Sequence, residues 1–249
     1  MKRHAFVGLA ATIAVVIGVV TYAATRPAPA KAPAAAITLT GTSYTERGAY
    51  YDIVVNYASS TPLLAEVGPA ADTAAIAAMK AFVSGTIAQF KTDGNFANLT
   101  QDNIQGRKET LQITYLIASS AHTISYIFTT YEDTLGAHGN MFFQTFTFDT
   151  TTGAPLALAD LFAPGADYLG TLSSISRAEL PNVIGKSADT GFIERGTTPE
   201  DKNFSDFFFD NRQLVILFAP YAVAPYSSGP QTLRIPVSEL SSILKPVYR

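Results

Sequence analysis

The chain has 249 residues, of which 47% are hydrophobic and 15% are charged, and it contains no Cys, no Trp and 3 His. The absence of cysteine excludes disulfides, thiol nucleophiles, iron–sulfur clusters, Cys-ligated zinc and a lipobox-type lipid anchor within these residues. Three histidines argue against a His-rich metal cage. We therefore expect no cofactor and no metal.

The N-terminal segment has the pattern of a membrane-targeting sequence. Residues 1–4 carry Lys2 and Arg3, and residues 5–24 are an uncharged apolar run. A helix needs about 20 such residues to cross a bilayer. We predict a cytoplasmic tip at 1–4, a transmembrane signal-anchor at 5–24 and the rest of the chain outside the cytoplasm. The alternative is a signal peptide cleaved near residues 28–30, which would leave a secreted protein.

A linker and an acidic domain follow the apolar run. Residues 25–36 are rich in Ala and Pro, which favours a stiff, extended spacer. Residues 37–249 then hold 13 basic and 20 acidic side chains, a net charge of −7. This balance argues against nucleic-acid binding. It would attract cationic partners, although solubility alone is another interpretation.

Hydrophobic periodicity predicts strands in runs and segregated helices. Alternation predicts strands over 51–57, 111–117, 124–128, 142–148, 204–209, 213–219 and 233–237. Apolar stripes predict helices over 72–90, with Asp72 or Thr73 as N-cap, and over 167–180, disturbed at Pro181. Residues 185–202 are expected to be a loop and 238–244 a short helix. The pattern favours an α+β fold with a mainly antiparallel sheet and two principal helices.

The C-terminal half contains short motifs in a fixed order: Leu135-Gly136-Ala137-His138-Gly139, Phe146-Thr147-Phe148-Asp149, Leu158-Ala159-Asp160-Leu161-Phe162, the loop 220–229 and Ile235-Pro236-Val237-Ser238-Glu239-Leu240. This set resembles an exported domain of unknown function shared by the anti-sigma factor RsiV and the peptidoglycan deacetylase PdaC, in its non-catalytic region. The resemblance covers about residues 132–244. Residues 37–118 resemble, more faintly, the companion region of the same proteins. We therefore divide the exported part into an N-terminal α+β region, 37–131, and a C-terminal RsiV/PdaC-like domain, 132–249.

The resemblance implies binding or sensing more readily than catalysis. RsiV uses this exported region to sense lysozyme. The chemistry of PdaC belongs to a separate metal-dependent domain with a Thr-Phe-Asp-Asp motif and a His-x-x-x-His pair. Here Thr147-Phe148-Asp149 is followed by Thr150, and the sequence has no such His pair. We interpret these residues as a strand end and turn.

Three residues on predicted loops are the candidate ligand contacts. His138 lies on a glycine-flanked turn, where it could contact a ligand, act as a general base, or tie the turn to a neighbouring loop by hydrogen bonds. Tyr221 and Tyr226 lie in the loop 220–229, whose two prolines fix backbone angles. Such a loop suits recognition of a protein or sugar, or a rigid crossover whose tyrosines seal the core.

Other catalytic arrangements find little support. No Gly-x-Ser-x-Gly elbow is present. His122 opens a predicted strand and is interpreted as a strand-end polar residue. Glu132 and Asp133 would point to opposite faces of a strand, so we interpret them as part of a solvated turn rather than as paired acids. We therefore name no catalytic and no metal-ligating residue.

Two functions follow as expectations. The first is a membrane-anchored, extracytoplasmic, non-catalytic binding or sensing domain whose ligand is cell-wall glycan or a cationic wall-active protein such as lysozyme. The alternative is a cell-wall-directed hydrolase or deacetylase-related enzyme that uses His138.

Overall fold

The computed structural model describes residue 39 and residues 41–249, which lie in a compact unit spanning Ala34–Arg249. The predicted cytoplasmic tip, membrane helix and Ala/Pro linker lie outside the described residues. Across the described part of the chain, no helix combines the length and apolarity needed to cross a bilayer.

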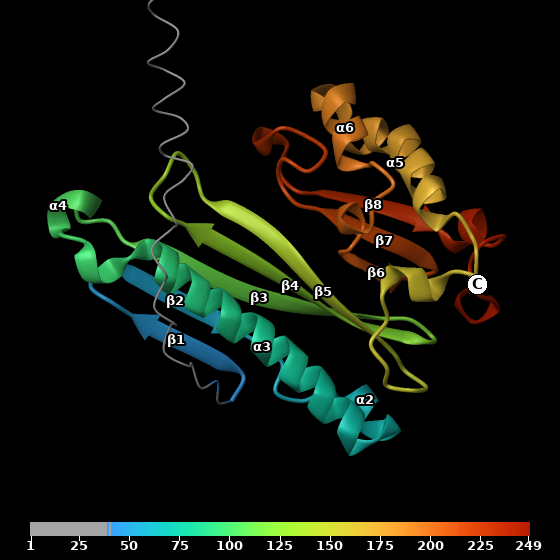
Figure 1. Ribbon diagram of the computed structural model, residues 1–249, viewed down its shortest axis with the longest axis horizontal. Helices are drawn as coiled ribbons and strands as arrows, with labels where there is room; N and C mark the ends of the chain where they lie inside the picture. The colour runs from blue at the N-terminus through green and yellow to red at the C-terminus, as the bar shows by residue number, and fades with distance from the viewer. Residues whose placement is uncertain (1–38, 40) are drawn as a thin grey trace, which may run out of the picture. The chain divides into compact units, whose positions relative to one another are not determined.

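A five-stranded sheet forms the first half of the described chain (Figure 1). Its order is β1 (Ser43–Arg47), β2 (Tyr51–Asn56), β3 (Glu109–Ser119), β4 (Thr123–Asp133) and β5 (Asn140–Asp149). Neighbours are antiparallel except β2 and β3, which are parallel. A parallel pair needs a crossover, and here the chain between β2 and β3 forms α2 (Pro62–Val67), α3 (Pro69–Gly94) and α4 (Gln101–Ile104).

Helix α3 covers one face of this sheet (Figure 1). Its inward stripe is the predicted one, with Met79, Val83, Ile87 and Phe90 buried in one cluster with residues of β2, β3 and β4. The helix is longer than the predicted 72–90. Each buried aliphatic side chain stabilises the fold by about 1.5–3 kcal/mol, so this stripe fixes the helix on the sheet.

The predicted N-cap of this helix is wrong. The N-cap is Gly68, with Pro69 in the first turn. Asp72 instead accepts a hydrogen bond from the backbone N–H of Thr61, 2.7 Å away, and another from the Thr61 hydroxyl. Its carboxylate therefore ties the start of α2 to α3, a contact that local capping rules do not include.

The second sheet is antiparallel and has the order β6 (Phe207–Asp210), β7 (Gln213–Phe218) and β8 (Gln231–Pro236). Helices α5 (Tyr168–Ile184) and α6 (Thr190–Gly196) lie on the same side of it (Figure 1). A second core forms between α5, α6 and the sheet, and includes Leu172, Leu180, Ile193, Leu214 and Ile235. The strands predicted over 204–209 and 213–219 thus correspond to β6 and β7, which form an antiparallel hairpin.

Several expected boundaries differ in this half. Helix α5 continues through Pro181 to Ile184. The expected loop 185–202 contains α6, whose N-cap Asp189 accepts from the Phe192 N–H at 3.0 Å. The expected helix 238–244 is only a 3-10 turn, Val237–Leu240. The polar composition of this segment gave no helical signal. A helix as short as α6 needs only one inward side chain, Ile193, and an N-cap, so it shows no apolar stripe.

The α+β class is confirmed, with two sheets and α3 and α5 as the longest described helices. The boundary placed between residues 131 and 132 falls inside β4, and the first sheet continues to Asp149. Glu132 and Asp133 are consequently the last two residues of β4 and not a turn. The strand is longer than its apolar core because β4 pairs with β3 and β5 up to these residues.

Candidate functional site: an aromatic cluster at His138

The connection between β4 and β5 carries His138 and has a constrained backbone. Leu135 is left-handed, with φ +62°, and its N–H donates to Asp133 Oδ1 at 2.8 Å. At Gly139 an added Cβ would lie 2.3 Å from the Tyr131 hydroxyl oxygen. A larger residue here would require the Tyr131 side chain to move. The turn thus packs against strand β4 through Gly139.

The His138 ring makes hydrogen bonds through both nitrogens. Nδ1 lies 2.9 Å from the Gly139 carbonyl oxygen and Nε2 lies 3.1 Å from the Tyr221 hydroxyl. A carbonyl only accepts, so Nδ1 carries the proton, and in the neutral ring Nε2 accepts from Tyr221. The Tyr226 hydroxyl donates to the same Gly139 carbonyl at 2.7 Å. That oxygen thus uses both of its lone pairs.

The three predicted residues form one cluster, which we call the aromatic cluster (His138, Tyr221 and Tyr226). His138 stacks on Tyr226 with ring centroids 3.6 Å apart and planes 16° apart. The Tyr221 ring lies 5.9 Å from His138 and 5.5 Å from Tyr226. Residues more than 80 positions apart are therefore joined by stacking and hydrogen bonds. The expectation that His138 ties its turn to a neighbouring loop agrees with these contacts, and its ligand-binding role stays a prediction.

Tyr221 is exposed, as is His138, whereas Tyr226 is half-buried, and Tyr221 has an unusual backbone. Its side chain is 53% exposed and its φ is +70°. A left-handed backbone costs a non-glycine residue about 1–2 kcal/mol. The loop is supported by α6, since a Cβ on Gly196 would lie 1.9 Å from the Ala222 carbonyl oxygen. Sequence reasoning missed this support, because a glycine at the end of an unpredicted helix gives no signal of its own.

The chemistry available to the cluster is that of a binding surface. It offers the exposed ring and hydroxyl of Tyr221 and an exposed imidazole whose two nitrogens already have partners that are not carboxylates. Among the described residues, no group of three or more His, Cys, Asp or Glu side chains could hold a metal ion.

The other acidic and histidine residues considered from sequence lie elsewhere. His122 precedes β4, at the end opposite to His138. Glu132 lies near Glu109 at the His138 end of the sheet. Burial raises the pKa of both carboxyls, and repulsion from Glu132 and Asp133 raises that of Glu109 further. Neither carboxyl has a hydrogen bond to His138, so the structure does not bring them into its cluster.

Comparison with known proteins finds a family match in the second half of the chain and one curated relative that matches over a longer stretch. Residues 159–238 match the family described as "Protein of unknown function (DUF3298)". The chain is 33% identical over 172 residues to peptidoglycan-N-acetylmuramic acid deacetylase PdaC of Bacillus subtilis, which covers 69% of this chain and 36% of the deacetylase. The chain thus spans about a third of the length of this curated relative.

Solved structures share the fold. A member of the DUF3298 family from Bacteroides fragilis superposes with a TM-score of 0.56 at 15% identity, covering 83% of this chain and 94% of that one. A DUF3298 family protein from Pseudomonas aeruginosa gives 0.50 at 15% identity, covering 86% and 97%. Tyr221 and Tyr226 lie inside the family match and His138 lies before it. Residues 159–238 of this chain are thus similar in sequence to the DUF3298 family, and the chain shares its fold with the two solved members.

Proposed function

We propose that this chain is a non-catalytic binding domain that works outside the cytoplasm, held at the membrane by residues 5–24, and that it binds cell-wall glycan through the aromatic cluster. The relationship to a peptidoglycan deacetylase supports the ligand class. Because the match spans only part of that enzyme, we infer from it the class of ligand, cell-wall glycan, and not the deacetylation reaction.

The observation that carries the proposal is the exposed Tyr221 ring. It is 53% exposed in a left-handed backbone and is braced by the His138 ring at its hydroxyl. Backbone strain of this kind persists only where the surrounding contacts enforce the strained conformation, and such positions are often found at ligand sites. An immobilised tyrosine offers a flat apolar face and a hydroxyl, which is what stacking on a sugar ring requires.

The same geometry disfavours the alternative of a hydrolase that uses His138. A histidine base is normally oriented by a carboxylate and faces a nucleophile or water. Here its Nδ1 faces the Gly139 carbonyl and its Nε2 a tyrosine hydroxyl. The stack on Tyr226 also covers one face of the imidazole.

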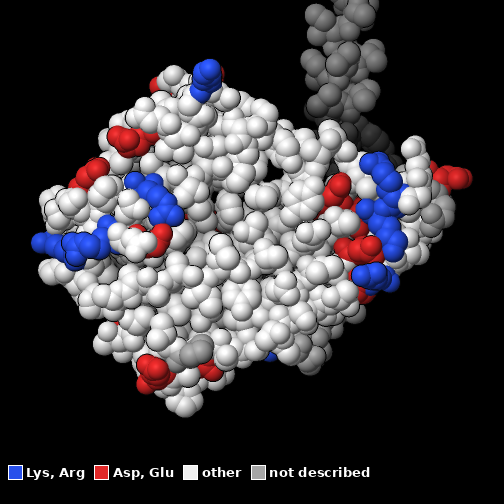
Figure 2. All heavy atoms as spheres, turned by 180° about the vertical axis from the view of Figure 1, so that it is seen from behind, with Lys and Arg blue, Asp and Glu red and all other residues white. Residues whose placement is uncertain are grey.

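A cationic wall-active protein is the second candidate ligand, and the net charge of −7 over residues 37–249 favours it. On the face drawn in Figure 2, however, acidic side chains lie near basic ones at the two lateral ends, and the centre carries no charge. On this face, therefore, no acidic patch is seen that would hold a cationic protein, and a long-range attraction by net charge raises association rates more than affinity. Glycan is therefore the first candidate.

The test is calorimetric titration of the full-length protein with soluble peptidoglycan fragments and, separately, with lysozyme. Tyr221→Ala should weaken fragment binding about three- to tenfold, the value of one aromatic stack. Leu116→Ala, which removes a 72% exposed apolar side chain from the first sheet, is the matched control and should change nothing. Fragment turnover that disappears in His138→Ala would instead support the enzyme, and binding of lysozyme alone would support the second candidate.

The location is tested separately. Protease added outside intact spheroplasts should digest residues 37–249, and the protein should remain in the membrane pellet after a carbonate wash. A soluble form that starts near Lys31 would show that the apolar segment is a cleaved signal.

A further inference from the structure

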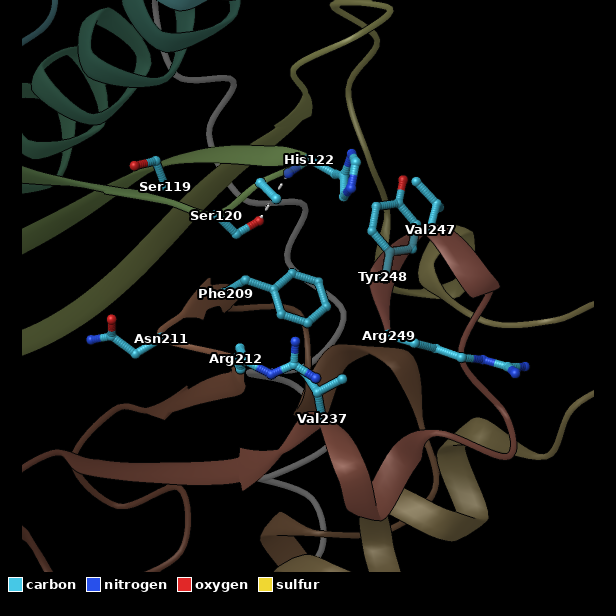
Figure 3. Close-up of a pocket in the computed structure, with 11 residues that line it drawn as sticks. Ser119, Ser120, His122, Phe209, Asn211, Arg212, Val237, Val247, Tyr248 and Arg249 are labelled. Carbon is cyan, nitrogen blue, oxygen red and sulfur yellow. Dashed lines mark hydrogen bonds between the residues drawn. The ribbon is translucent and has the colours of Figure 1, made fainter.

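A separate pocket of about 280 Å³ lies at the end of β4 opposite to the aromatic cluster. It is lined by four segments: the β3–β4 hairpin 119–122, the β6–β7 turn with Phe209, Val237 after β8, and the C-terminal segment 247–249 (Figure 3). Strand β4 has 11 residues, so at about 3.3 Å per residue the two places are some 35 Å apart. No part of the aromatic cluster lines this pocket.

Contacts hold these segments together without a ligand. The Val237 N–H donates to the Arg212 carbonyl at 2.9 Å, and the Thr150 N–H donates to the His122 carbonyl at 3.0 Å. The ring of Tyr248 stacks on Phe209 with centroids 6.0 Å apart and planes 19° apart. A pocket built from fixed segments loses little conformational entropy when it binds.

Arg212 is the unusual residue of the pocket. Asn211 and Arg212 both have left-handed backbones, with φ +46° and +60°. Two-residue hairpin turns of this kind strongly favour glycine at the second position. The chain instead places an arginine there, at a conformational cost of about 1–2 kcal/mol. In Figure 3 its side chain extends toward Phe209 and Val237.

The Arg212 guanidinium has no hydrogen-bond or ion-pair partner among the described residues. The nearby acids are already engaged. Asp210 pairs with Arg234 at 2.7 Å. Asp149 accepts from the Thr151 and Thr152 N–H groups at 2.8 Å and from the Tyr248 hydroxyl at 3.3 Å. Within residues 41–249, the five N–H donors of this arginine therefore have no acceptor, which makes them available to an external anion.

The remaining lining indicates what carries that anion. His122 and Arg249 also line the pocket, and in the part of the chain that the structure describes the His122 ring and the guanidinium NH2 groups of Arg249 have no hydrogen-bond partner. Ser119 and Asn211 add polar side chains to the lining. A pocket of 280 Å³ is at the small end of ligand sites, the size of one ring rather than a chain.

We propose that this pocket binds a carboxylate carried on a single sugar-sized ring, with Arg212 as the bidentate partner of the carboxylate and Phe209 as the apolar wall. Arginine matches the two oxygens of a carboxylate with two parallel N–H bonds. Because the pocket shares no residue with the aromatic cluster, this site and the glycan surface can succeed or fail independently.

The test uses full-length protein and two sugars that differ in one group. N-acetylmuramic acid carries a lactyl carboxylate that N-acetylglucosamine lacks. Titrated into ¹⁵N-labelled protein, the first should shift the amide signals of residues 120–122 and 211–212 saturably, and the second should bind at least tenfold more weakly. Raising the salt concentration should weaken the first and leave the second unchanged, since only the first binds through charge.

Arg212→Gly is the decisive variant, because glycine suits the left-handed turn and the protein should keep or gain thermal stability. It should nevertheless lose N-acetylmuramic acid binding at least tenfold, while Tyr221→Ala keeps it. Equal binding of the two sugars, equal binding of inorganic phosphate, or unchanged affinity in folded Arg212→Gly would each overturn the proposal. If Tyr221→Ala loses peptidoglycan-fragment binding but still binds N-acetylmuramic acid, the result would support two separate sites.

Discussion

His138 stacks on Tyr226 with 3.6 Å between ring centroids, and both side chains contact the Gly139 carbonyl oxygen, His138 at 2.9 Å and Tyr226 at 2.7 Å. One carbonyl thus fixes two aromatic side chains from segments 87 positions apart in sequence. Tyr221 is then braced against the His138 ring from the outside. These contacts make the half-buried Tyr226 a positioning residue and leave Tyr221 as the exposed tyrosine of the cluster.

These contacts predict different effects for the two tyrosines. Tyr226→Phe keeps the stack and removes the hydroxyl that donates to Gly139, so it should lower the free energy of unfolding by about 0.5–1.5 kcal/mol. Tyr221→Phe removes the more exposed hydrogen bond to His138 and should lower the free energy of unfolding by less. Thermal unfolding followed by circular dichroism compares them, and a larger loss in Tyr221→Phe would contradict this prediction.

Gly196 is predicted to be indispensable to the loop that carries Tyr221. In Gly196→Ala the Cβ would lie 1.9 Å from the Ala222 carbonyl oxygen, so the backbone must move. We expect a destabilisation of about 1–3 kcal/mol, as for other overpacked sites, together with weaker fragment binding. Thermal unfolding and the calorimetric titration measure the two effects.

Gly85→Ala is the matched control for that variant. Gly85 lies in α3, where a Cβ would meet nothing within 4 Å. Replacing a helical glycine by alanine should stabilise the protein by about 0.5–1 kcal/mol. Opposite signs for the two Gly→Ala changes are therefore expected, and a stable Gly196→Ala protein would show that the loop tolerates the shift.

Local periodicity predicts much of this fold. The stripe of α3 and the alternation in β3, β4, β5 and β7 are visible because apolar side chains recur at the period of each element. Strand β1 shows no such signal, since it lies at the sheet edge and none of its five residues is buried. Helix α6 was missed for the same physical reason, with Ile193 as its single buried residue.

The sequence predicted the residues of the candidate site but not the contacts between them. His138, Tyr221 and Tyr226 stood out as polar or aromatic side chains on Gly- and Pro-bounded loops. That one carbonyl joins His138 and Tyr226 depends on tertiary placement, which no local pattern encodes. The Arg212 pocket was not predicted, because its four segments lie far apart in sequence and a hairpin turn signal does not tell whether the arginine of the turn lines a pocket or points into solvent.

Glu109 should be a source of instability at neutral pH. It is only 9% exposed, its Oε2 has no hydrogen-bond partner, and burial followed by repulsion from Glu132 and Asp133 raises the pKa of its carboxyl. Ionised Glu109 therefore destabilises the fold, and this destabilisation appears as the pH rises through the raised pKa. Glu109→Gln should melt higher than the parent at pH 7, by a few degrees.

The pH dependence separates charge from packing in that experiment. At pH values below the ordinary pKa of glutamate, Glu109 is neutral in both states and the two proteins should melt together. Glu66→Gln, at an exposed position on α2, is the control and should show no difference at either pH. A Glu109→Gln protein that melts lower at pH 7 would show that the carboxylate has a stabilising partner.

Glu46 is predicted to behave in the opposite way. Burial tends to raise the pKa of its carboxyl, but hydrogen bonds from Lys91, Tyr44 and Tyr51 outweigh burial and lower the pKa to about 2. The Lys91 ammonium lies 2.5 Å from its Oε2, and the Glu46 side chain is 29% exposed. A group with a lowered pKa stabilises the fold above its ordinary value of 4.5 and loses this contribution as the pH falls toward about 2.

Glu46→Gln should therefore lower the free energy of unfolding at pH 7 by about 1–2 kcal/mol, after allowance for solvent screening of a partly exposed carboxylate. Denaturant titrations at pH 7, 4 and 2 should show this difference shrinking with acidity until the two proteins coincide. Glu200→Gln removes the partner of Lys202 in a comparably short ion pair, 2.6 Å long, whose side chains are 50% and 74% exposed. That exposed pair should contribute almost nothing, because water screens the charges. Equal losses in the two variants would mean that the three donors around Glu46 do not act as a buried network, and the anchoring of β1 to α3 would then depend on packing alone.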